Sequence, residues 1–245
     1  MTEPKPTLVL LHGLGATGEV WNPLINVAAW PGRVLAPDLR GHGSSNWSPS
    51  YSFGEMAADV ATLLSSNEDY VVLGHSMGGA VGAALATGFF GHLPRAVGMI
   101  GVKLQWSEEE LRRLPDIAAK PSRLFDTRGD AIEWFLKLSG LAGVLEPDDS
   151  SLERGVERTE QGWRVRQDPK SVLVVTGSPP FSELLNGLSA PISLALGEHD
   201  PLVAPEHHND LPCAPPRVFK GLGHNAMVED PAMVWDWFLE VTNRI

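Results

Sequence analysis

The sequence contains very little cysteine and has fewer basic than acidic residues. Its 245 residues include one cysteine, Cys213, which excludes an intramolecular disulfide and any Cys-x-x-Cys metal motif. It has 19 Lys and Arg residues against 30 Asp and Glu residues, so the formal net charge is -11. Because no basic run interrupts this acidic balance, we expect no nucleic acid among the partners of the chain.

Long hydrophobic segments are also absent. No stretch approaches the ~18 consecutive apolar residues of a membrane span, and residues 1–6 show neither the apolar segment nor the cleavage site of a signal peptide. We therefore expect a cytoplasmic protein without a membrane partner. A hydrophobic content of 43% allows a sizeable core, in one α/β domain with an insertion or in two small domains. Nothing in the sequence indicates an oligomeric state.

Short apolar runs recur along the chain, most of them without the polar alternation of a half-exposed strand. Such runs are typical of strands buried on both faces of a parallel sheet. Helical patterns separate them, and two helices have clear start signals in Ser52 followed by Glu55 and in Asp230 before Pro231. The alternation predicts an α/β fold with a doubly wound, mostly parallel sheet. The predicted strands are residues 7–11, 33–36, 70–73, 96–102, 191–196 and 217–219, and the predicted helices are 19–29, 52–64, 79–90 and 231–242.

The regular alternation stops at about residue 105 and resumes at about residue 187. The intervening segment is richer in Arg, Glu, Asp and Pro. Its sequence predicts helices at 107–114 and 130–138. We therefore predict a core formed by residues 1–104 and 187–245, with residues 105–186 inserted as a small helical cap over one edge of the sheet.

The pentapeptide Gly74-His75-Ser76-Met77-Gly78 follows one of the apolar runs directly and precedes a helical pattern. It predicts a strand, a sharp turn and a helix, with Ser76 at the apex of the turn. Glycines are needed around such a turn because side chains there would collide with the strand and the helix. This arrangement exposes a serine as a nucleophile, whereas an ordinary serine at a helix start would not need the flanking glycines.

A serine hydroxyl is a poor nucleophile at neutral pH, so it needs a base and a third group that orients the base. His224 follows the last predicted strand, and Asp200 follows the strand before it. Because the carboxyl ends of parallel strands meet at one edge of the sheet, Ser76, Asp200 and His224 should converge there. Glu198 is the alternative acid, and Asp200 could instead cap the turn before Pro201.

The chain resembles the α/β-hydrolase fold family, specifically its carboxylesterase-like members that use a serine nucleophile and carry a helical cap. The resemblance rests on four features, taken in chain order: His12-Gly13-Leu14-Gly15, Asp38-Leu39-Arg40-Gly41-His42-Gly43, the pentapeptide around Ser76, and His224. It implies the chain order serine, acid, histidine. It also implies that the backbone amides of Leu14 and Met77 form the oxyanion hole. Only six residues precede the first strand, so we expect about six strands and not the two extra N-terminal strands of many members.

Other polar residues of the motifs fit structural roles better than catalytic ones. We expect His42 and His75 to pack within their loops, and Asp38 and Arg40 to shape a loop through hydrogen bonds, although both could contact substrate. The remaining histidines are not spaced for metal coordination, and no cofactor or metal is implied. The aromatic side chains of the insertion could line an apolar substrate pocket or form the core of the cap; these are Trp106, Trp134, Phe135 and Trp163.

A serine nucleophile with an oxyanion hole predicts hydrolysis of the carboxylic ester of a small, apolar substrate through an acyl-enzyme. A serine in place of aspartate argues against the epoxide hydrolases and haloalkane dehalogenases of the family. The C–C hydrolases resemble the chain less, because their elbow has Asn before the serine and Trp after the histidine, whereas His75 and Asn225 stand here. The C–C hydrolases stay an alternative all the same, together with the pyruvate-eliminating lyase of the menaquinone pathway and a receptor that binds a small ligand without turnover.

Overall fold

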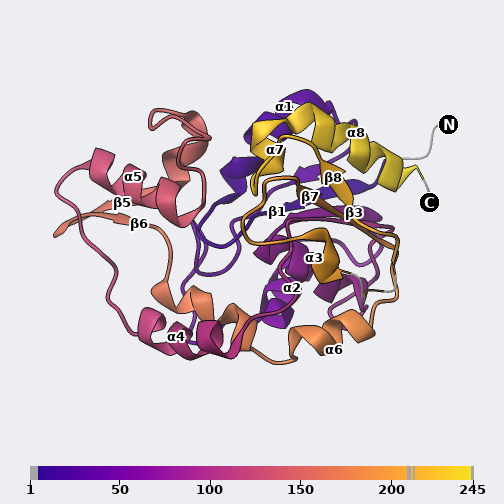
Figure 1. Ribbon diagram of the computed structural model, residues 1–245, viewed down its shortest axis with the longest axis horizontal. Helices are drawn as coiled ribbons and strands as arrows, with labels where there is room; N and C mark the ends of the chain where they lie inside the picture. Colours follow the sequence, from indigo (N-terminus) through magenta and orange to yellow (C-terminus); the bar gives the residue numbers. More distant parts are fainter. Residues whose placement is uncertain (1–4, 209–210, 212, 244–245) are drawn as a thin grey trace.

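The computed structural model describes residues 5–208, 211 and 213–243. Residues 1–4, on which the expected absence of a signal peptide partly rests, lie outside them, as does Pro212 next to Cys213. A six-stranded sheet runs through the molecule in the order β2-β1-β3-β4-β7-β8, and all its neighbouring strands are parallel (Figure 1). The strands are β1 (Thr7–Leu11), β2 (Val34–Leu35), β3 (Tyr70–His75), β4 (Val97–Ile100), β7 (Ile192–Gly197) and β8 (Arg217–Phe219).

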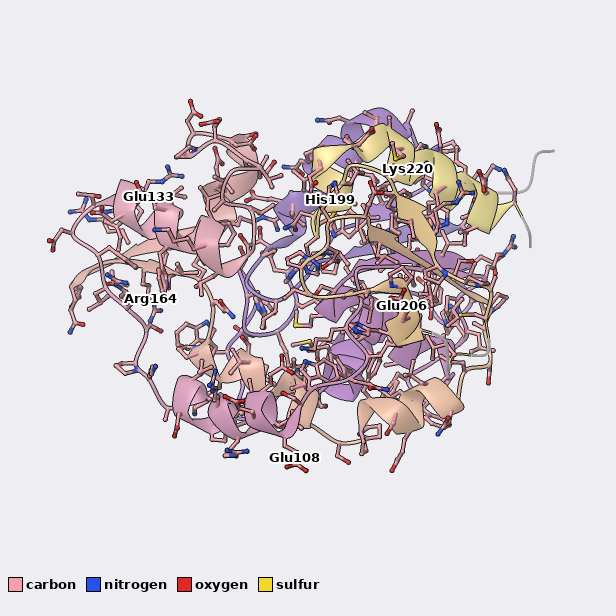
Figure 2. The ribbon with its side chains drawn as sticks, in the orientation of Figure 1. Glu108, Glu133, Arg164, His199, Glu206 and Lys220 are labelled. Atoms are coloured by element: carbon pink, nitrogen blue, oxygen red, sulfur yellow. The ribbon has the colours of Figure 1, made fainter. Side chains whose placement is uncertain are left out.

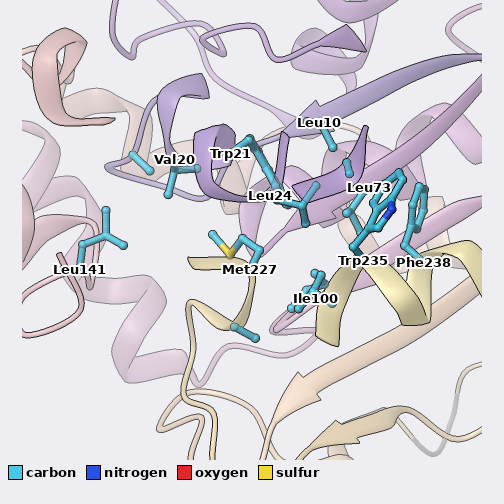
Figure 3. Close-up of a cluster of buried hydrophobic side chains, with 14 of the residues drawn as sticks. Leu10, Val20, Trp21, Leu24, Leu73, Ile100, Leu141, Met227, Trp235 and Phe238 are labelled. Atoms are coloured by element: carbon cyan, nitrogen blue, oxygen red, sulfur yellow. The ribbon is translucent and has the colours of Figure 1, made fainter. Parts of the chain in front are cut away.

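The sheet has an apolar cluster on each of its two faces, because successive side chains of a strand point to opposite sides. Leu8 and Leu10 of β1 belong to one cluster, whereas Val9 and Leu11 belong to the other, and all four are fully buried. Figure 3 shows Leu10 and Leu73 in the first cluster with Trp21, Leu24, Trp235 and Phe238. Helices α1 (Asn22–Ala28), α7 (Ala226–Glu229) and α8 (Pro231–Thr242) cover this face, and α2 (Phe53–Thr62), α3 (Met77–Ala86) and α6 (Phe181–Asn186) cover the other. The predicted doubly wound sheet is confirmed.

Both helix starts identified from the sequence are present. The Ser52 side chain accepts a hydrogen bond from the Glu55 amide at 3.1 Å, and the Asp230 side chain accepts one from the Met233 amide at 2.9 Å. The predicted helix 19–29 is divided into a 3-10 turn, η1 (Gly18–Trp21), and α1. The division falls next to Pro23, which has no backbone N–H to continue a helix from the preceding residues. No helix of the described residues combines the length and the apolar character needed to cross a bilayer.

The insertion contains helices and also a β-hairpin that we did not predict. Strands β5 (Val156–Thr159) and β6 (Gly162–Val165) pair antiparallel, and Glu157 lies opposite Arg164, whose Nε donates to its carboxylate at 2.7 Å. The end of the insertion, α6, packs against α3 of the core. The other elements between β4 and β8 are α4 (Glu108–Ala118), α5 (Arg128–Leu138), η2 (Ser150–Gly155), η3 (Pro169–Thr176) and η4 (Pro205–His208). In Figure 1, α5 and the hairpin stand to one side of the sheet and α4 lies below them.

Candidate active site

Ser76 occupies the sharp turn between β3 and α3, in a strained backbone conformation. Its φ is 50° and its ψ is -117°, which costs a non-glycine residue on the order of 1–3 kcal/mol. The turn is held by a hydrogen bond of 2.8 Å from the Ser76 amide to the carbonyl of Ile100 on β4. The Ser76 hydroxyl does not cap helix α3. Its oxygen is therefore not engaged in the helix start, where a serine side chain commonly is.

The glycines of the pentapeptide are required by close approaches of the backbone. A Cβ at Gly74 would lie 2.4 Å from the carbonyl oxygen of Gly78, and a Cβ at Gly78 would lie 2.1 Å from that of Leu11. No real Cβ contact is that short, so the strand and the helix could not come together with alanine at either position. Strand β1 lies directly behind the turn, and its residue Leu11 pairs in register with Gly74.

The loop after β1 and the turn after β3 diverge from adjacent strands, which is where open α/β sheets bind ligands. Leu14 lies in the first loop, and Met77 is the first residue of α3, where the amide has no carbonyl of its own helix to bond. Within the described part of the chain, neither amide donates to another protein group. Leu14 and Met77 also line the same cavity as Ser76. Both amides are therefore available to an oxygen bound beside Ser76.

Asp200 is the carboxylate that contacts His224. Its Oδ2 lies 2.8 Å from Nδ1 of His224, and its Oδ1 accepts hydrogen bonds from the amides of Leu202 and Val203 at 2.8 and 3.2 Å. The Asp200 side chain is fully buried and that of His224 is 15% exposed. The alternative acid Glu198 instead accepts a hydrogen bond from the Gly221 amide at 2.9 Å. With Nδ1 engaged by a carboxylate, Nε2 is the ring nitrogen of His224 that remains for another partner.

The loop that carries His224 is held from two further sides. The Glu229 carboxylate accepts hydrogen bonds from the amides of Gly223 at 2.6 Å and Asn225 at 3.1 Å, the two residues that flank His224. The buried Asn225 side chain donates from Nδ2 to the carbonyl of Gly140, at the end of α5, at 2.9 Å. Sequence analysis identified neither Glu229 nor Asn225 as part of the site. No spacing signal marks them, because their partners are backbone groups.

His75 and His12 are buried and neutral. Nε2 of His75 donates to the backbone carbonyl of His224, and burial holds the pKa of His75 well below 6.5, with the neighbouring His224 lowering it further. Nε2 of His12 accepts from the Leu39 amide at 2.8 Å, and burial lowers the pKa of His12 to about 4. These rings therefore connect the loops around Ser76 as uncharged hydrogen-bonding groups.

Asp38 and Arg40 bond to protein groups, as expected for residues that shape a loop. The Asp38 carboxylate, 3% exposed, accepts from the amides of Gly18 and Ser44 at 2.8 Å each and contacts Arg154 at 3.2 Å. The Arg40 guanidinium donates to Asp59 through Nε at 2.6 Å and through a second nitrogen at 2.8 Å. His42 is fully buried, and burial lowers its pKa to about 3. Among the described residues, no three His, Cys, Asp or Glu side chains are grouped to hold a metal ion.

A cavity of about 470 Å³ opens beside Ser76, and we call it the Ser76 cavity. Its wall includes His224 together with Leu14 and Met77. On the side of the inserted segment, the wall is formed by residues 137–140 at the end of α5. The cavity is bounded mainly by apolar groups; its lining comprises Gly13, Leu14, Phe53, His75, Ser76, Met77, Ala80, Lys103, Trp106, Lys137, Leu138, Ser139, Gly140, Val174, Val175, Pro201, Leu202 and His224.

Of the four aromatic residues considered as pocket lining, the structure brings only Trp106 to the Ser76 cavity. Phe135 is 2% exposed and packs so closely under Gly155 that a Cβ there would lie 2.7 Å from its ring. Trp163 is in β6, where its backbone pairs with Phe125, and it packs against an apolar cluster. Trp134 lines neighbouring cavities of the cap. Trp106 therefore fits the first of the two alternatives, pocket lining, whereas Phe135 and Trp163 fit the second, packing within the inserted segment.

Comparison with known proteins decides the family. A model of the alpha/beta hydrolase family matches residues 8–237, which is most of the chain. The chain belongs to the alpha/beta hydrolase family. This membership agrees with the resemblance drawn from the motifs and with the parallel six-stranded sheet. Hydrolytic activity is the activity that the family and its relatives support.

Relatives of this alpha/beta hydrolase include proteins with known names and solved structures. A protein named "Putative carbamate hydrolase RutD" from Serratia proteamaculans (strain 568) is 30% identical over 220 residues, which cover 84% of this chain and 77% of the relative. The thioesterase domain from the curacin biosynthetic pathway superposes with a TM-score of 0.76 at 23% identity, covering 96% of this chain and 91% of that one. A thermophilic esterase from Thermogutta terrifontis gives 0.74 at 21% identity, covering 98% and 90%. At these low identities, the similarity to the two solved structures shows a shared fold and nothing further.

Proposed function

We propose that the chain is a serine hydrolase that cleaves the carboxylic ester of a small, largely apolar substrate through an acyl-enzyme on Ser76. One observation carries the proposal: Ser76 and His224 line the same cavity, and Asp200 holds His224 by its Nδ1. A nucleophile, a base and a group that orients the base are the parts this chemistry needs. The largely apolar cavity wall suits an uncharged acyl or alkyl portion.

The first half of the reaction transfers the acyl group to the enzyme. Ser76 Oγ attacks the carbonyl carbon of the ester while His224 Nε2 takes its proton. The tetrahedral oxyanion receives hydrogen bonds from the amides of Leu14 and Met77. Removal of one such donor has cost about 2.7–4 kcal/mol in another serine hydrolase. The C–O bond then breaks, and His224 returns the proton to the departing alcohol.

The second half regenerates the enzyme with water. His224 takes a proton from a water molecule, whose oxygen attacks the carbonyl carbon of the acyl-enzyme. The bond to Ser76 Oγ breaks, and the proton passes from His224 to the serine as the carboxylic acid leaves. The same steps would open a carbamate, whose carbonyl also bears an oxygen leaving group. The name of the RutD relative is a reason to include carbamates among the substrates tested.

The test is a series of p-nitrophenyl esters from acetate to decanoate, together with a p-nitrophenyl carbamate, against the wild type and Ser76→Ala. We expect turnover by the wild type, labelling of Ser76 by a fluorophosphonate probe, and loss of both in Ser76→Ala. A protein that hydrolyses no ester and takes no label would contradict the proposal. Labelling without turnover of any ester would instead favour the lyase or the receptor.

The acid is tested with a matched pair of variants. Asp200→Asn should lower kcat by up to about 10⁴-fold, the loss seen when the same change was made in another triad enzyme, because Asn stabilises the wrong tautomer. Glu198→Gln, two residues away in the same loop, should keep wild-type activity, since Glu198 bonds the Gly221 amide and not His224. An equal loss in both variants would count against Asp200 as the orienting acid.

A further inference from the structure

We propose that the ester substrate bears an anionic group, which binds beyond Leu138 in a second cavity formed by the inserted segment itself. This inference rests on the proposed function, because it describes what the Ser76 cavity receives. The second cavity has a volume of about 270 Å³. Its wall includes Ile117, Lys120, Arg123, Trp134, Leu138 and Val165.

The two cavities have one lining residue in common, at the end of α5. Leu138 lines both of them, so it forms a shared wall between the Ser76 cavity and the second cavity. Trp134 and Leu138 are four residues apart, which places them on one face of the helix. A substrate that starts at Ser76 and follows this face passes Leu138 and reaches Trp134. Trp134 would then contribute to binding although it does not line the Ser76 cavity.

The charges on the two linings are one-sided. In a chain with 30 acidic and 19 basic residues, the linings contain four cations and no Asp or Glu among the described residues. In the Ser76 cavity these are Lys103, which is paired with Glu110, and Lys137. The second cavity contributes Lys120 and Arg123. Lys120, Arg123 and Lys137 are exposed residues, and positive charge gathered along a cavity attracts an anion.

The second cavity is the better anion site, because both of its cations lack a carboxylate partner among the described residues, whereas in the Ser76 cavity Lys103 is paired with Glu110 and only Lys137 is not. The Arg123 guanidinium lies over the rings of Phe125 and Trp134, at 4.9 and 5.0 Å from their centroids. These contacts fix the planar group that best matches a carboxylate or phosphate. A further cavity, which Arg123, Trp134 and Lys137 also line, contains the carboxylates that would repel an anion: Asp126, Asp130 and Glu133.

The test compares esters with and without a carboxylate. One arm uses mono-p-nitrophenyl esters of dicarboxylic acids, from succinate to sebacate, against p-nitrophenyl esters of monocarboxylic acids with the same number of carbons. The other arm places the carboxylate on the alcohol, with the butyrate ester of 3-hydroxybenzoate against phenyl butyrate. We expect a preference of about tenfold or more in kcat/KM for the carboxylate in one arm, which also identifies the side that bears it. Added salt should weaken it.

The variants separate charge from packing. The double variant Lys120→Met/Arg123→Met should reduce the preference several-fold, whereas the charge-conserving Lys120→Arg/Arg123→Lys should retain most of it. Leu138→Trp should slow the long dicarboxylic esters more than the succinate ester, because a larger side chain at this shared wall would obstruct a substrate that extends from one cavity to the other. Lys220→Met is the control: Figure 2 shows Lys220 over the core, away from Glu133 on α5. This control should keep the wild-type preference.

Two results would overturn the inference: a wild type that prefers the neutral ester at every length in both arms, or a preference unchanged in Lys120→Met/Arg123→Met. Neither result affects the proposed function, which is judged by hydrolysis of neutral esters and by the fluorophosphonate label. If neither neutral nor carboxylated esters react and no label appears, the proposed function itself fails.

Discussion

Nε2 of His75 donates a hydrogen bond of 2.9 Å to the backbone carbonyl of His224, and the two rings meet edge to face with centroids 4.6 Å apart. His75 precedes Ser76 in the turn, so this bond joins the strand that carries the proposed nucleophile to the loop that carries the proposed base. The Asp200 carboxylate fixes the ring of His224, and His75 fixes its backbone. The position of His224 therefore depends on contacts from two strands.

Replacing His75 by Phe should lower kcat about fivefold. Phe keeps an aromatic ring next to His224 but removes the donor, and one hydrogen bond contributes on the order of 1 kcal/mol. Because the effect concerns the position of His224, KM should change less than kcat. His199→Phe is the control, since the His199 side chain is 68% exposed on the loop after β7 (Figure 2). Equal kcat values for wild type and His75→Phe would exclude this positioning role.

Gly101→Ala should lower kcat by about tenfold to a hundredfold. A Cβ at Gly101 would lie 3.0 Å from Asp200 Oδ2 and 3.2 Å from the ring of His224, so it must displace the pair. Displacement of a reacting group by about 1 Å can cost 10²-fold. The matched control is Gly143→Ala, because Gly143 has a similarly positive φ of 80° but nothing within 4 Å of its Cβ. If both variants lose the same activity, backbone strain and not contact with the pair is the cause.

Glu229→Gln should reduce activity about tenfold and leave the fold intact. The Glu229 carboxylate accepts from the amides on both sides of His224, whereas the NH₂ group of Gln would face one of these donors with a donor of its own. Steady-state kinetics and circular dichroism of the variant test this expectation. Glu206→Gln serves as the comparison, because Glu206 is an exposed residue of η4. Activity equal to that of Glu206→Gln would show that the hydrogen bonds of Glu229 to the Gly223 and Asn225 amides do not affect catalysis.

Stability should fall as the pH falls from about 6.5 toward 4. Burial lowers the pKa of His12 to about 4 and that of His42 to about 3, whereas an unfolded histidine titrates near 6.5. In this window the unfolded chain binds protons that the folded chain does not, so acid favours unfolding. The free energy of unfolding should decrease by up to about 1.4 kcal/mol per pH unit for each such histidine.

The measurement is urea unfolding at pH 7.5, 6.0 and 5.0. Hydrogen bonds from Ser65, Thr7 and Arg33 lower the pKa of Glu68 to about 2. The stability that the Glu68 carboxylate contributes is therefore lost mainly below pH 5.0, outside the measured range. His42→Gln should flatten the decline, while His199→Gln, at an exposed position, should not. Unfolding midpoints that stay constant between pH 7.5 and 5.0 would contradict the assignment of His12 and His42 as buried neutral groups.

The parallel sheet could be predicted from the sequence, and so could the nearness of Asp200 and His224, whose side chains lie 2.8 Å apart. That Ser76, Asp200 and His224 act together stays a prediction. Each of the three residues follows a predicted strand, and parallel strands bring such positions to one edge whatever the details of packing. The sequence favours Asp200 and leaves Glu198 as the alternative acid. The backbone of the turn separates the two, because it directs the Asp200 carboxylate to His224 and the Glu198 carboxylate to Gly221.

The cap could not be predicted to the same degree. Trp134 and Phe135 are adjacent on one helix and therefore point in different directions. Which of the two side chains is buried depends on the space under Gly155, where the Phe135 ring packs. The hairpin has strands of only four residues, too short for the alternation of apolar side chains to identify them. Glu229 binds backbone amides, and no residue type marks an amide that needs a partner.

The most direct test of the account is to trap the acyl-enzyme. Wild-type protein mixed with a p-nitrophenyl ester and quenched in acid should give a burst of nitrophenol equal to the enzyme concentration. Intact-mass analysis should find one added acyl group, and peptide mapping should locate it on Ser76. An acyl group on another residue, or steady turnover that persists in Ser76→Ala, would contradict the central claim that Ser76 is the nucleophile.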